Sequence, residues 1–252
     1  MNYRKLSLAK RNLLAYLIIL GMFSCSPKLR LTGSEKNQYP ISSDRPKDEK
    51  IIEYYLPYKK RVDSLLNGII AVSAVEIVKS RPEGPLNNLM ADAMFAAGKS
   101  RNIDFDLAYT NYGGLRVPLP KGNIPLFKVY ELMPFENLIT TVKFSGPDML
   151  SFFDYMAAMG GDPISGASYI IRNKKAADIK INGQAFDPAR SYTVLTSDYM
   201  ANGGDGGEIF LKSTDRKEYD LKLRDALIIY LQHQTNEGRM LNPQRDGRIK
   251  VE

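Results

Sequence analysis

The sequence predicts one folded domain of the α+β class, preceded by a targeting segment. Helical and strand patterns alternate irregularly along the chain, and hairpin signals interrupt them. This mixture favours the α+β class over a doubly wound parallel sheet. The chain contains only one cysteine, so no internal disulfide can form. Stability must therefore come from a packed core, which a domain of about 200 residues can supply.

Residues 1–24 have the composition of a secretory signal peptide. The segment opens with the basic residues Arg4, Lys5, Lys10 and Arg11. An apolar run follows from Leu13 to Phe23, which is shorter than the about 20 apolar residues that a transmembrane helix needs. The run ends beside Cys25, so we expect lipidation of Cys25 and a membrane-anchored bacterial lipoprotein on the periplasmic side of the envelope. An ordinary signal peptide and an uncleaved anchor are the alternatives.

The net charge does not indicate a nucleic-acid-binding protein. The chain carries 35 Lys and Arg against 28 Asp and Glu, a formal charge of +7. More than half of this excess lies in residues 1–24, which contain no acidic residue. Since no basic stripe occurs in the remaining sequence, we expect no nucleic-acid partner.

A flexible tether is expected at residues 25–47, and the folded domain is expected at residues 48–252. The tether is polar, contains Pro27, Pro40 and Pro46, and shows no apolar periodicity. A helix is expected after Asp48, with Pro57 kinking or delaying it. Its apolar residues recur at roughly helical spacing: Ile51, Ile52, Tyr55, Leu56, Tyr58, Val62, Leu65 and Leu66.

Patterns within the domain predict further helices and strands. Expected strands span residues 69–78, 106–110, 138–144, 192–196 and 248–251. Expected helices span residues 85–97, 145–160 and 221–232. Gly98 is expected to end the first of these helices, and Ser145 to cap the second. Asn182-Gly183 predicts a type I' hairpin turn, because both central residues of that turn need a positive φ.

The single histidine restricts the chemistry available to this chain. A hydrolytic di-metal site usually needs several histidines and bridging carboxylates, and His233 is expected to be a solvated helix residue. No Gly-x-Ser-x-Gly motif of a nucleophilic serine occurs. The residue counts therefore argue against an autonomous metallohydrolase. We expect no cofactor or metal in this chain.

Two glycine-rich segments are candidate binding loops. In the first, residues 111–116, the pair Gly113-Gly114 lets the backbone approach a ligand, while Asn111 and Arg116 offer an amide and a guanidinium. A tight turn carrying a surface arginine is the alternative interpretation.

The second segment, residues 202–207, places four glycines around Asp205. Such a loop is costly in conformational entropy, which indicates a specific role. A calcium loop is one interpretation, but it would need more acidic residues at alternate positions. The carboxylate is alternatively suited to accept hydrogen bonds from vicinal sugar hydroxyls.

The two loops and several shorter motifs resemble the C-terminal domain of 5'-nucleotidases over roughly residues 65–251. The family shows an Asn-x-Gly-Gly-x-Arg turn and a later aromatic-x-Ala-Asn-Gly-Gly-Asp-Gly segment. The matching segments, in chain order, are 87–93, 111–116, 134–135, 182–183, 199–206 and 246–249. The metal-bearing N-terminal domain of the family has no counterpart in this sequence.

The resemblance implies a four-layer α/β/β/α sandwich that holds the nucleoside part of a nucleotide. By residue match, Phe135 and Tyr199 would clamp the base, Asp205 would bind the ribose hydroxyls, and Asn111 and Arg116 would contact base edge, ribose or phosphate. The same motifs add further candidates: Gly113, Gly114, Asn202 and Gly204. Arg81 stands near the place of another family arginine, although it is shifted by one residue.

Three hypotheses follow from the resemblance. The first is the specificity half of a split 5'-nucleotidase in nucleotide catabolism, with divalent metals only in a separate phosphatase chain. The second is a non-catalytic lipoprotein that binds nucleotides or nucleosides. The third is a domain retained for a structural contact, which would bind neither.

Overall fold

The structure, a computed structural model, describes residues 12, 13, 16, 30–40, 42 and 45–252. Cys25 and nearly all of the expected signal peptide lie outside the described residues, so both stay predictions. The chain divides into two units, residues 1–49 and 50–252, and all the sheets lie in the second. Within the described ranges, no helix is long and apolar enough to cross a membrane.

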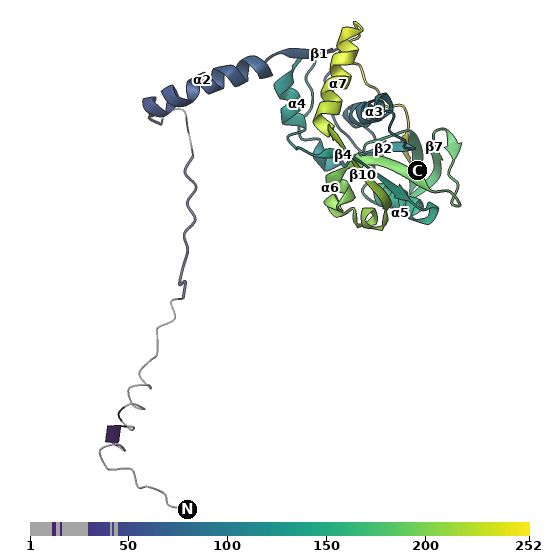
Figure 1. Cartoon of the computed structure of the whole chain (residues 1–252), viewed down its shortest axis with the longest axis horizontal. Coiled ribbons are helices and arrows are strands. Elements are labelled where there is room, and N and C mark those ends of the chain that lie inside the picture. Colours follow the sequence, from purple (N-terminus) through teal and green to yellow (C-terminus); the bar gives the residue numbers. More distant parts are fainter. Residues whose placement is uncertain (1–11, 14–15, 17–29, 41, 43–44) are drawn as a thin grey trace, which may run out of the picture. The chain divides into compact units, whose positions relative to one another are not determined.

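The second unit combines helices with short strands (Figure 1). Its helices and 3-10 turns are α2 (Glu49–Leu66), α3 (Pro85–Ser100), η1 (Tyr112–Gly114), α4 (Leu126–Leu132), α5 (Gly146–Ala158), α6 (Asp198–Ala201), η2 (Gly204–Gly206), η3 (Glu208–Lys212) and α7 (Leu223–Asn236). Helix α2 begins at the last residue of the first unit, Glu49. Its strands are β1 (Ile69–Ser73), β2 (Leu107–Tyr109), β3 (Gly122–Pro125), β4 (Leu138–Phe144), β5 (Ile164–Ser165), β6 (Ala167–Arg172), β7 (Lys175–Ile181), β8 (Gln184–Ala185), β9 (Tyr192–Ser197), β10 (Thr214–Lys222) and β11 (Ile249–Val251).

The strands form a central five-stranded sheet, a four-stranded sheet and a small pair. The five-stranded sheet has the order β10-β4-β9-β2-β5, and the four-stranded sheet has the order β11-β6-β7-β8. Strands β1 and β3 form the antiparallel pair. Within the five-stranded sheet, β2 and β9 run parallel, and β4 pairs with β9 antiparallel. The carboxyl ends of β2 and β9 therefore meet the start of β4 at one edge of the sheet.

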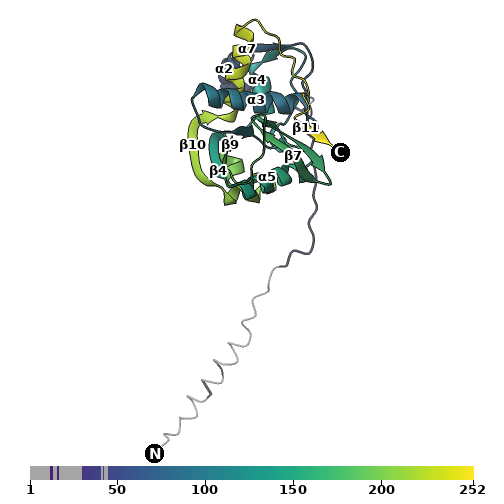
Figure 2. The same ribbon diagram turned by 90° about the vertical axis from the view of Figure 1, so that its right-hand side faces the viewer.

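Two apolar cores lie on opposite faces of the five-stranded sheet. Helices α3 and α7 cover one face, while α5 lies on the other side with the four-stranded sheet (Figure 2). Successive side chains of a strand point to opposite faces of the sheet, so neighbouring residues belong to different cores. Ala108 and Leu195 belong to the core under α3, whereas Leu107, Tyr109 and Val194 belong to the core under α5. Two sheets with helices on both sides confirm the predicted α+β class and sandwich arrangement.

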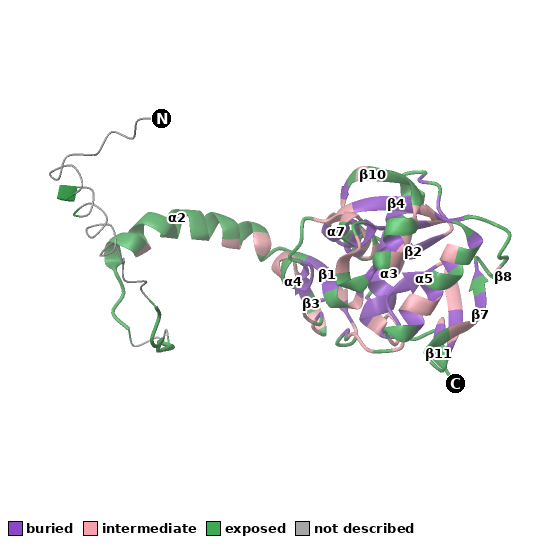
Figure 3. Cartoon of the chain, turned by 90° about the horizontal axis from the view of Figure 1, so that it is seen from below, coloured by how far each residue is buried: buried purple, intermediate pink, exposed green. Residues whose placement is uncertain are grey.

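Helix α2 confirms the helix expected after Asp48, but it differs from a core helix. None of its residues is buried, and Figure 3 shows it exposed over most of its length, with a few residues of intermediate exposure. It begins at Glu49 and runs through Pro57 to Leu66, so Pro57 neither delays the start of the helix nor ends it.

Most of the other expected elements are confirmed, with three informative differences. Strand β10 was not expected from the sequence, because its burial pattern is almost entirely exposed and therefore leaves no apolar alternation. Charged side chains are typical of such an edge strand, since they discourage pairing with other chains. The expected strand at 69–78 ends at Ser73. Helix α7 begins at Leu223 instead of Leu221, because Leu221 and Lys222 belong to β10, and it continues four residues past Gln232 to Asn236.

Two local predictions are confirmed in detail. Ser145 caps α5, its hydroxyl accepting a hydrogen bond from the Asp148 amide. The Asn182-Gly183 turn joins β7 to β8 with φ values of 49° and 76°, as a type I' turn requires. Gly98, in contrast, does not end α3, which continues to Ser100.

A buried carboxylate lies beside the core under α5. Asp162 is 1% exposed and accepts hydrogen bonds from Arg81 Nη2 and from the Tyr109 hydroxyl, both at 3.0 Å. Burial raises the pKa of Asp162 above its ordinary value, although Arg81 and Tyr109 act in the opposite direction. Arg81 is thereby fixed to the domain core.

Gly98→Ala should destabilise the domain, although alanine normally favours a helix over glycine by about 1 kcal/mol. A Cβ at this position would lie 2.5 Å from Phe105 Cε1 and 3.0 Å from Leu195 Cδ2, within the packed core. We expect a loss of about 1–3 kcal/mol in unfolding free energy, measured by urea denaturation. Gly68→Ala is the matched control, because its Cβ would have only one neighbour within 4 Å, Leu65 O at 3.7 Å. Equal effects of the two changes would contradict the packing explanation.

Asp162→Asn should change how stability depends on pH. The folded chain retains the Asp162 proton at pH values where the unfolded chain, with a pKa near 3.8, has released it. The wild-type chain should therefore lose stability relative to the variant as pH rises from 3.8 through the raised folded pKa. Denaturation over a pH series measures this difference, with the exposed Asp104→Asn as control. The raised pKa of Asp162 would be contradicted if the difference in unfolding free energy between wild type and variant stayed constant with pH. It would also be contradicted if wild type gained stability relative to the variant as pH rises.

Candidate functional site

A pocket of about 250 Å³ opens where β2 and β9 end and β4 begins. The residues that line it are Thr110, Asn111, Gly113, Gly114, Arg116, Met133, Phe135, Asn137, Ser197, Tyr199, Asp205 and Leu223. Crevices at the carboxyl ends of neighbouring strands are common ligand sites, because loops diverge there and leave space. The pocket therefore occupies a typical position for a small-molecule site.

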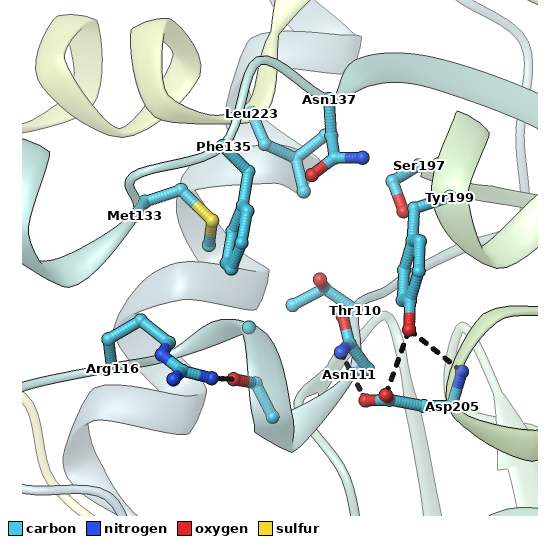
Figure 4. A pocket seen from close by; sticks show the side chains of 12 residues that line it. Thr110, Asn111, Arg116, Met133, Phe135, Asn137, Ser197, Tyr199, Asp205 and Leu223 are labelled. Carbon is cyan, nitrogen blue, oxygen red and sulfur yellow. Dashed lines mark hydrogen bonds between the residues drawn. The ribbon is translucent and has the colours of Figure 1, made fainter. Parts of the chain in front are cut away.

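Phe135 and Tyr199, called the aromatic pair below, face each other across the pocket (Figure 4). Phe135 is 39% exposed and Tyr199 is 42% exposed, so neither ring is part of a core. Tyr199 is placed by the short helix α6, which Ser197 caps by accepting a hydrogen bond from the Met200 amide at 3.1 Å. Two open, opposed rings are suited to hold a flat aromatic ligand between them.

Arg224, at the start of α7, holds the loop that carries Phe135. This residue is 4% exposed, and its Nη1 donates to the backbone oxygens of Met133 and Phe135 at 3.4 and 3.3 Å. Its Nη2 pairs with Glu136. Hydrogen bonds from Lys222 and Arg224 lower the pKa of Glu136 to about 2, so this carboxylate stays ionised in mildly acidic solution. Arg224 thus acts on the pocket indirectly, by fixing the backbone beside the ring.

Asp205 connects the two glycine-rich loops at the other side of the pocket. Its Oδ2 accepts a hydrogen bond from Asn111 Nδ2 at 2.5 Å, and its Oδ1 accepts one from the Tyr199 hydroxyl at 3.0 Å. The same hydroxyl accepts a bond from the Asp205 amide at 3.1 Å. These contacts place the carboxylate beside the aromatic pair, where it can accept hydrogen bonds from a ligand (Figure 4).

Glycines make this close approach possible. A Cβ on Gly113 would lie 2.7 Å from Asp205 Oδ2, and one on Gly204 would lie 2.4 Å from Tyr199 Cε1. Any side chain at either position would therefore push the carboxylate or the ring away. The glycine-rich composition of the loops thus has a packing cause within the site itself.

Cations gather around the first glycine-rich loop. Lys79 Nζ and Arg81 Cζ lie 4.2 and 4.6 Å from the centroid of the Tyr112 ring. Partial burial lowers the pKa of Lys79, and the neighbouring Arg116 and Arg81 lower it further. Of these cations, only Arg116 is among the residues lining the pocket. The mouth of the pocket is accordingly electropositive on this side.

The structure brings together most, but not all, of the residues expected to bind substrate. Seven of them line the pocket: Asn111, Gly113, Gly114, Arg116, Phe135, Tyr199 and Asp205. Gly204 instead supports the Tyr199 ring from outside the lining, and Asn202 accepts a hydrogen bond from Arg216 at 2.6 Å. Arg81 is engaged by Asp162 and also lies outside the lining. No ligand contact is observed for any of them, so the binding roles stay predictions.

Other lining residues were not expected to bind substrate. Thr110 and Ser197 occupy the carboxyl ends of two parallel strands, a position that marks ligand sites in such sheets. Strand ends in the sequence could therefore have indicated them. Asn137 also lines the pocket; its Nδ2 donates to Asp198 Oδ1 at 3.0 Å, and its amide oxygen faces the pocket (Figure 4).

The donor set of the pocket does not fit a catalytic di-metal centre. Asp205 is the only carboxylate among the lining residues, and it is already engaged by an amide and a phenol. The chain's one histidine, His233, pairs with Glu237 on the exposed side of α7 and is no part of this pocket. Within the described part of the chain, no cluster of three or more His, Cys, Asp and Glu is placed to hold a metal.

Comparison with known proteins identifies relatives of this domain. Protein UshA from Escherichia coli is 32% identical over 108 residues, which cover 40% of this chain and 19% of UshA. A 5'-nucleotidase from Vibrio vulnificus is 23% identical over 184 residues, covering 71% of this chain and 33% of the relative. The crystal structure of the 5'-nucleotidase precursor from Thermus thermophilus superposes with a TM-score of 0.68 at 26% identity, covering 82% of this chain and 44% of that one.

The chain thus spans less than half the length of the relatives that it matches. The family model of the 5'-nucleotidase C-terminal domain matches residues 69–212, more than half of the chain, including both glycine-rich loops and the aromatic pair. On these grounds the chain belongs to the 5'-nucleotidase C-terminal domain family.

Proposed function

We propose that this chain is the nucleoside-recognising part of a nucleotide phosphohydrolase of the 5'-nucleotidase type, in which a separate di-metal phosphatase chain performs the hydrolysis. The observation that carries the proposal is the aromatic pair, two exposed rings that oppose each other across a pocket with one carboxylate beside them. Flat rings recognise the face of a base, and the carboxylate recognises hydroxyl donors. Together they match the two chemically distinct parts of a nucleoside.

The base enters the space between Phe135 and Tyr199 in this proposal. Stacking on aromatic side chains contributes about 1–3 kcal/mol per base and tolerates different bases, because every base has a π face. Groups beside the rings then contact the base edge: the Asn137 amide oxygen as an acceptor, and the Thr110 hydroxyl, which is buried and has no hydrogen-bond partner among the described residues. An unsatisfied buried hydroxyl is costly, so a ligand that bonds to it gains affinity.

The sugar and phosphate occupy the opposite end of the pocket. Asp205 accepts hydrogen bonds from the ribose hydroxyls, while Asn111 and Arg116 lie along the same floor. Arg116 is exposed and beside the cations around Tyr112, so a negatively charged phosphate is favoured at this mouth. The phosphate is thereby presented outward, where a second protein can reach it.

Hydrolysis is assigned to a partner because the pocket offers positioning but no donor set for two metals. Holding a substrate in a productive orientation lowers the barrier of a reaction by several kcal/mol, about 7–11 in the best intramolecular cases. A partner's divalent metals would activate water for attack on phosphorus. A lipid anchor at Cys25 would keep the chain at a periplasmic membrane surface beside such an enzyme.

A second candidate is a lipoprotein that binds nucleotides or nucleosides without hydrolysis. It is favoured by the two opposed rings and the adjacent carboxylate, which can bind a nucleoside without any metal chemistry. The two candidates differ in whether binding or partner-dependent turnover is the main property.

Phe135→Ala should weaken nucleoside binding by the full chain about tenfold or more, because it removes one of the two stacking surfaces. Isothermal titration calorimetry with adenosine, uridine and their 5'-monophosphates measures the change. Leu150→Ala is the control, since Leu150 is 40% exposed on α5, like Phe135 at 39%, but lies outside the pocket. Equal affinity of the Phe135 variant and wild type would contradict the base site.

Asp205→Ala should reduce nucleotide hydrolysis by a co-purified metallophosphatase without changing that enzyme's action on a phosphoester lacking ribose. The physical reason is that the substitution removes orientation of the sugar, not the metal chemistry. Phosphate release is measured with and without this chain, using p-nitrophenyl phosphate as the second substrate. Hydrolysis that is indifferent to this chain and to both Asp205→Ala and Phe135→Ala would sink the split-enzyme hypothesis and leave the binding lipoprotein.

A further inference from the structure

We propose that the Tyr199 hydroxyl holds the Asp205 carboxylate in an orientation that accepts a vicinal diol, and so sets a preference of the pocket for ribose over deoxyribose ligands. This inference rests on the proposed nucleoside site. It assigns to Tyr199 a role beyond stacking, which a phenylalanine at the same position would not have.

The contacts between Tyr199 and Asp205 form a closed ring of two hydrogen bonds. The hydroxyl donates to Oδ1 at 3.0 Å and accepts from the Asp205 amide at 3.1 Å. Side chain and backbone of Asp205 are therefore both fixed by one phenol. Asn111 Nδ2 supplies a donor to the other carboxylate oxygen, Oδ2.

Counting acceptor positions indicates which ligand fits this arrangement. An ionised carboxylate has about four lone-pair sites, two on each oxygen. Asn111 and Tyr199 each occupy one, on different oxygens, so one site remains on each oxygen. A cis-vicinal diol presents two neighbouring donors that match these two sites. A ligand that lacks one hydroxyl leaves an acceptor unsatisfied once the pocket is closed by the ligand.

The loop needs this restraint because little else fixes the carboxylate. Gly203, two residues before Asp205, and Gly206, directly after it, have φ values of 82° and 73°, and Asp205 itself has a φ of 50°. The residue is exposed, and its backbone oxygen accepts one further hydrogen bond, from the Tyr155 hydroxyl at 3.2 Å. Among the described residues, the carboxylate would keep only the bond from Asn111 without the Tyr199 hydroxyl, and it could then rotate among several orientations.

The ring and the hydroxyl of Tyr199 can be separated by substitution. The ring lies directly over Gly204, and α6 fixes its backbone, so a phenylalanine there keeps the stacking surface. Tyr199→Phe therefore removes the carboxylate contact alone. Tyr155→Phe is the matched control, because it removes a phenol that contacts the backbone of Asp205 and not its carboxylate.

The experiment compares the affinity of the full chain for adenosine and uridine with that for their 2',3'-dideoxy analogues. Calorimetry gives a selectivity ratio for each variant. We expect the wild-type chain and Tyr155→Phe to prefer the ribonucleosides. Tyr199→Phe should lose about tenfold or more of that preference, through weaker ribonucleoside binding at unchanged dideoxynucleoside binding.

Amide hydrogen exchange of the ligand-free chain gives a second measurement that needs no nucleoside. The Asp205 amide should exchange faster in Tyr199→Phe than in wild type, because its acceptor is removed. An unchanged selectivity ratio, an equal loss for both ligand classes, or unchanged exchange would each overturn the inference while leaving the nucleoside site intact. A wild-type chain that binds no nucleoside would instead overturn the proposed function itself.

Discussion

Asp205 reaches from one glycine-rich loop to Asn111 in another, and the pocket depends on that contact. The loops are 94 residues apart in sequence and meet because β2 and β9 run parallel as neighbours in the five-stranded sheet. Parallel neighbours bring their carboxyl ends to the same edge, so the segments that follow them must share one space. The glycines then determine how closely they approach, since a side chain on Gly113 would collide with the carboxylate. The sheet provides the position and the glycines provide the proximity.

The two halves of the pocket are held by different means. Tyr199 and Asp205 belong to a short helix and turn that are fixed mainly by local hydrogen bonds. Phe135 lies on a loop whose backbone oxygens are bound by Arg224, a buried guanidinium from the far end of the chain. A buried guanidinium is expensive unless its donors are used, and here the loop supplies acceptors for both Nη atoms, while the buried Nε has no hydrogen-bond partner among the described residues. Opposed rings can therefore remain exposed to solvent while their backbones stay in place, which is what a preorganised stacking site requires.

The sequence predicted those features that depend on local chemistry. The capping hydroxyl of Ser145 and the Asn182-Gly183 turn each follow from one or two neighbouring residues, and both are confirmed. The strand expected at residues 138–144 is confirmed as β4 with the same bounds. Features that depend on partners distant in sequence were missed. Gly98 has the appearance of a helix terminator, but its role is to admit the Phe105 ring to the core. Arg224 resembles an ordinary charged helix residue until the carbonyls of Met133 and Phe135 are placed beside it. Strand β10 lacks apolar alternation because its position at the edge of the sheet leaves it exposed.

The same distinction between local features and features that depend on distant residues explains how much of the candidate site could be inferred from the sequence. The family motifs identified Asn111, Phe135, Tyr199 and Asp205, because the resemblance assigns these motif residues to one site. All four line the same pocket in the structure. Arg81 was carried over by position alone, and its guanidinium is engaged by Asp162 outside the lining. A carried-over cation keeps a ligand-binding role only if no buried carboxylate is closer to it, since a desolvated carboxylate attracts a guanidinium strongly and in fixed geometry. Arg116 faces no such competitor and donates only to the backbone oxygen of Gly113, at 3.4 Å, among the described contacts. The electropositive mouth of the pocket therefore depends chiefly on Arg116, and a phosphate bound there would remain accessible to a catalytic partner.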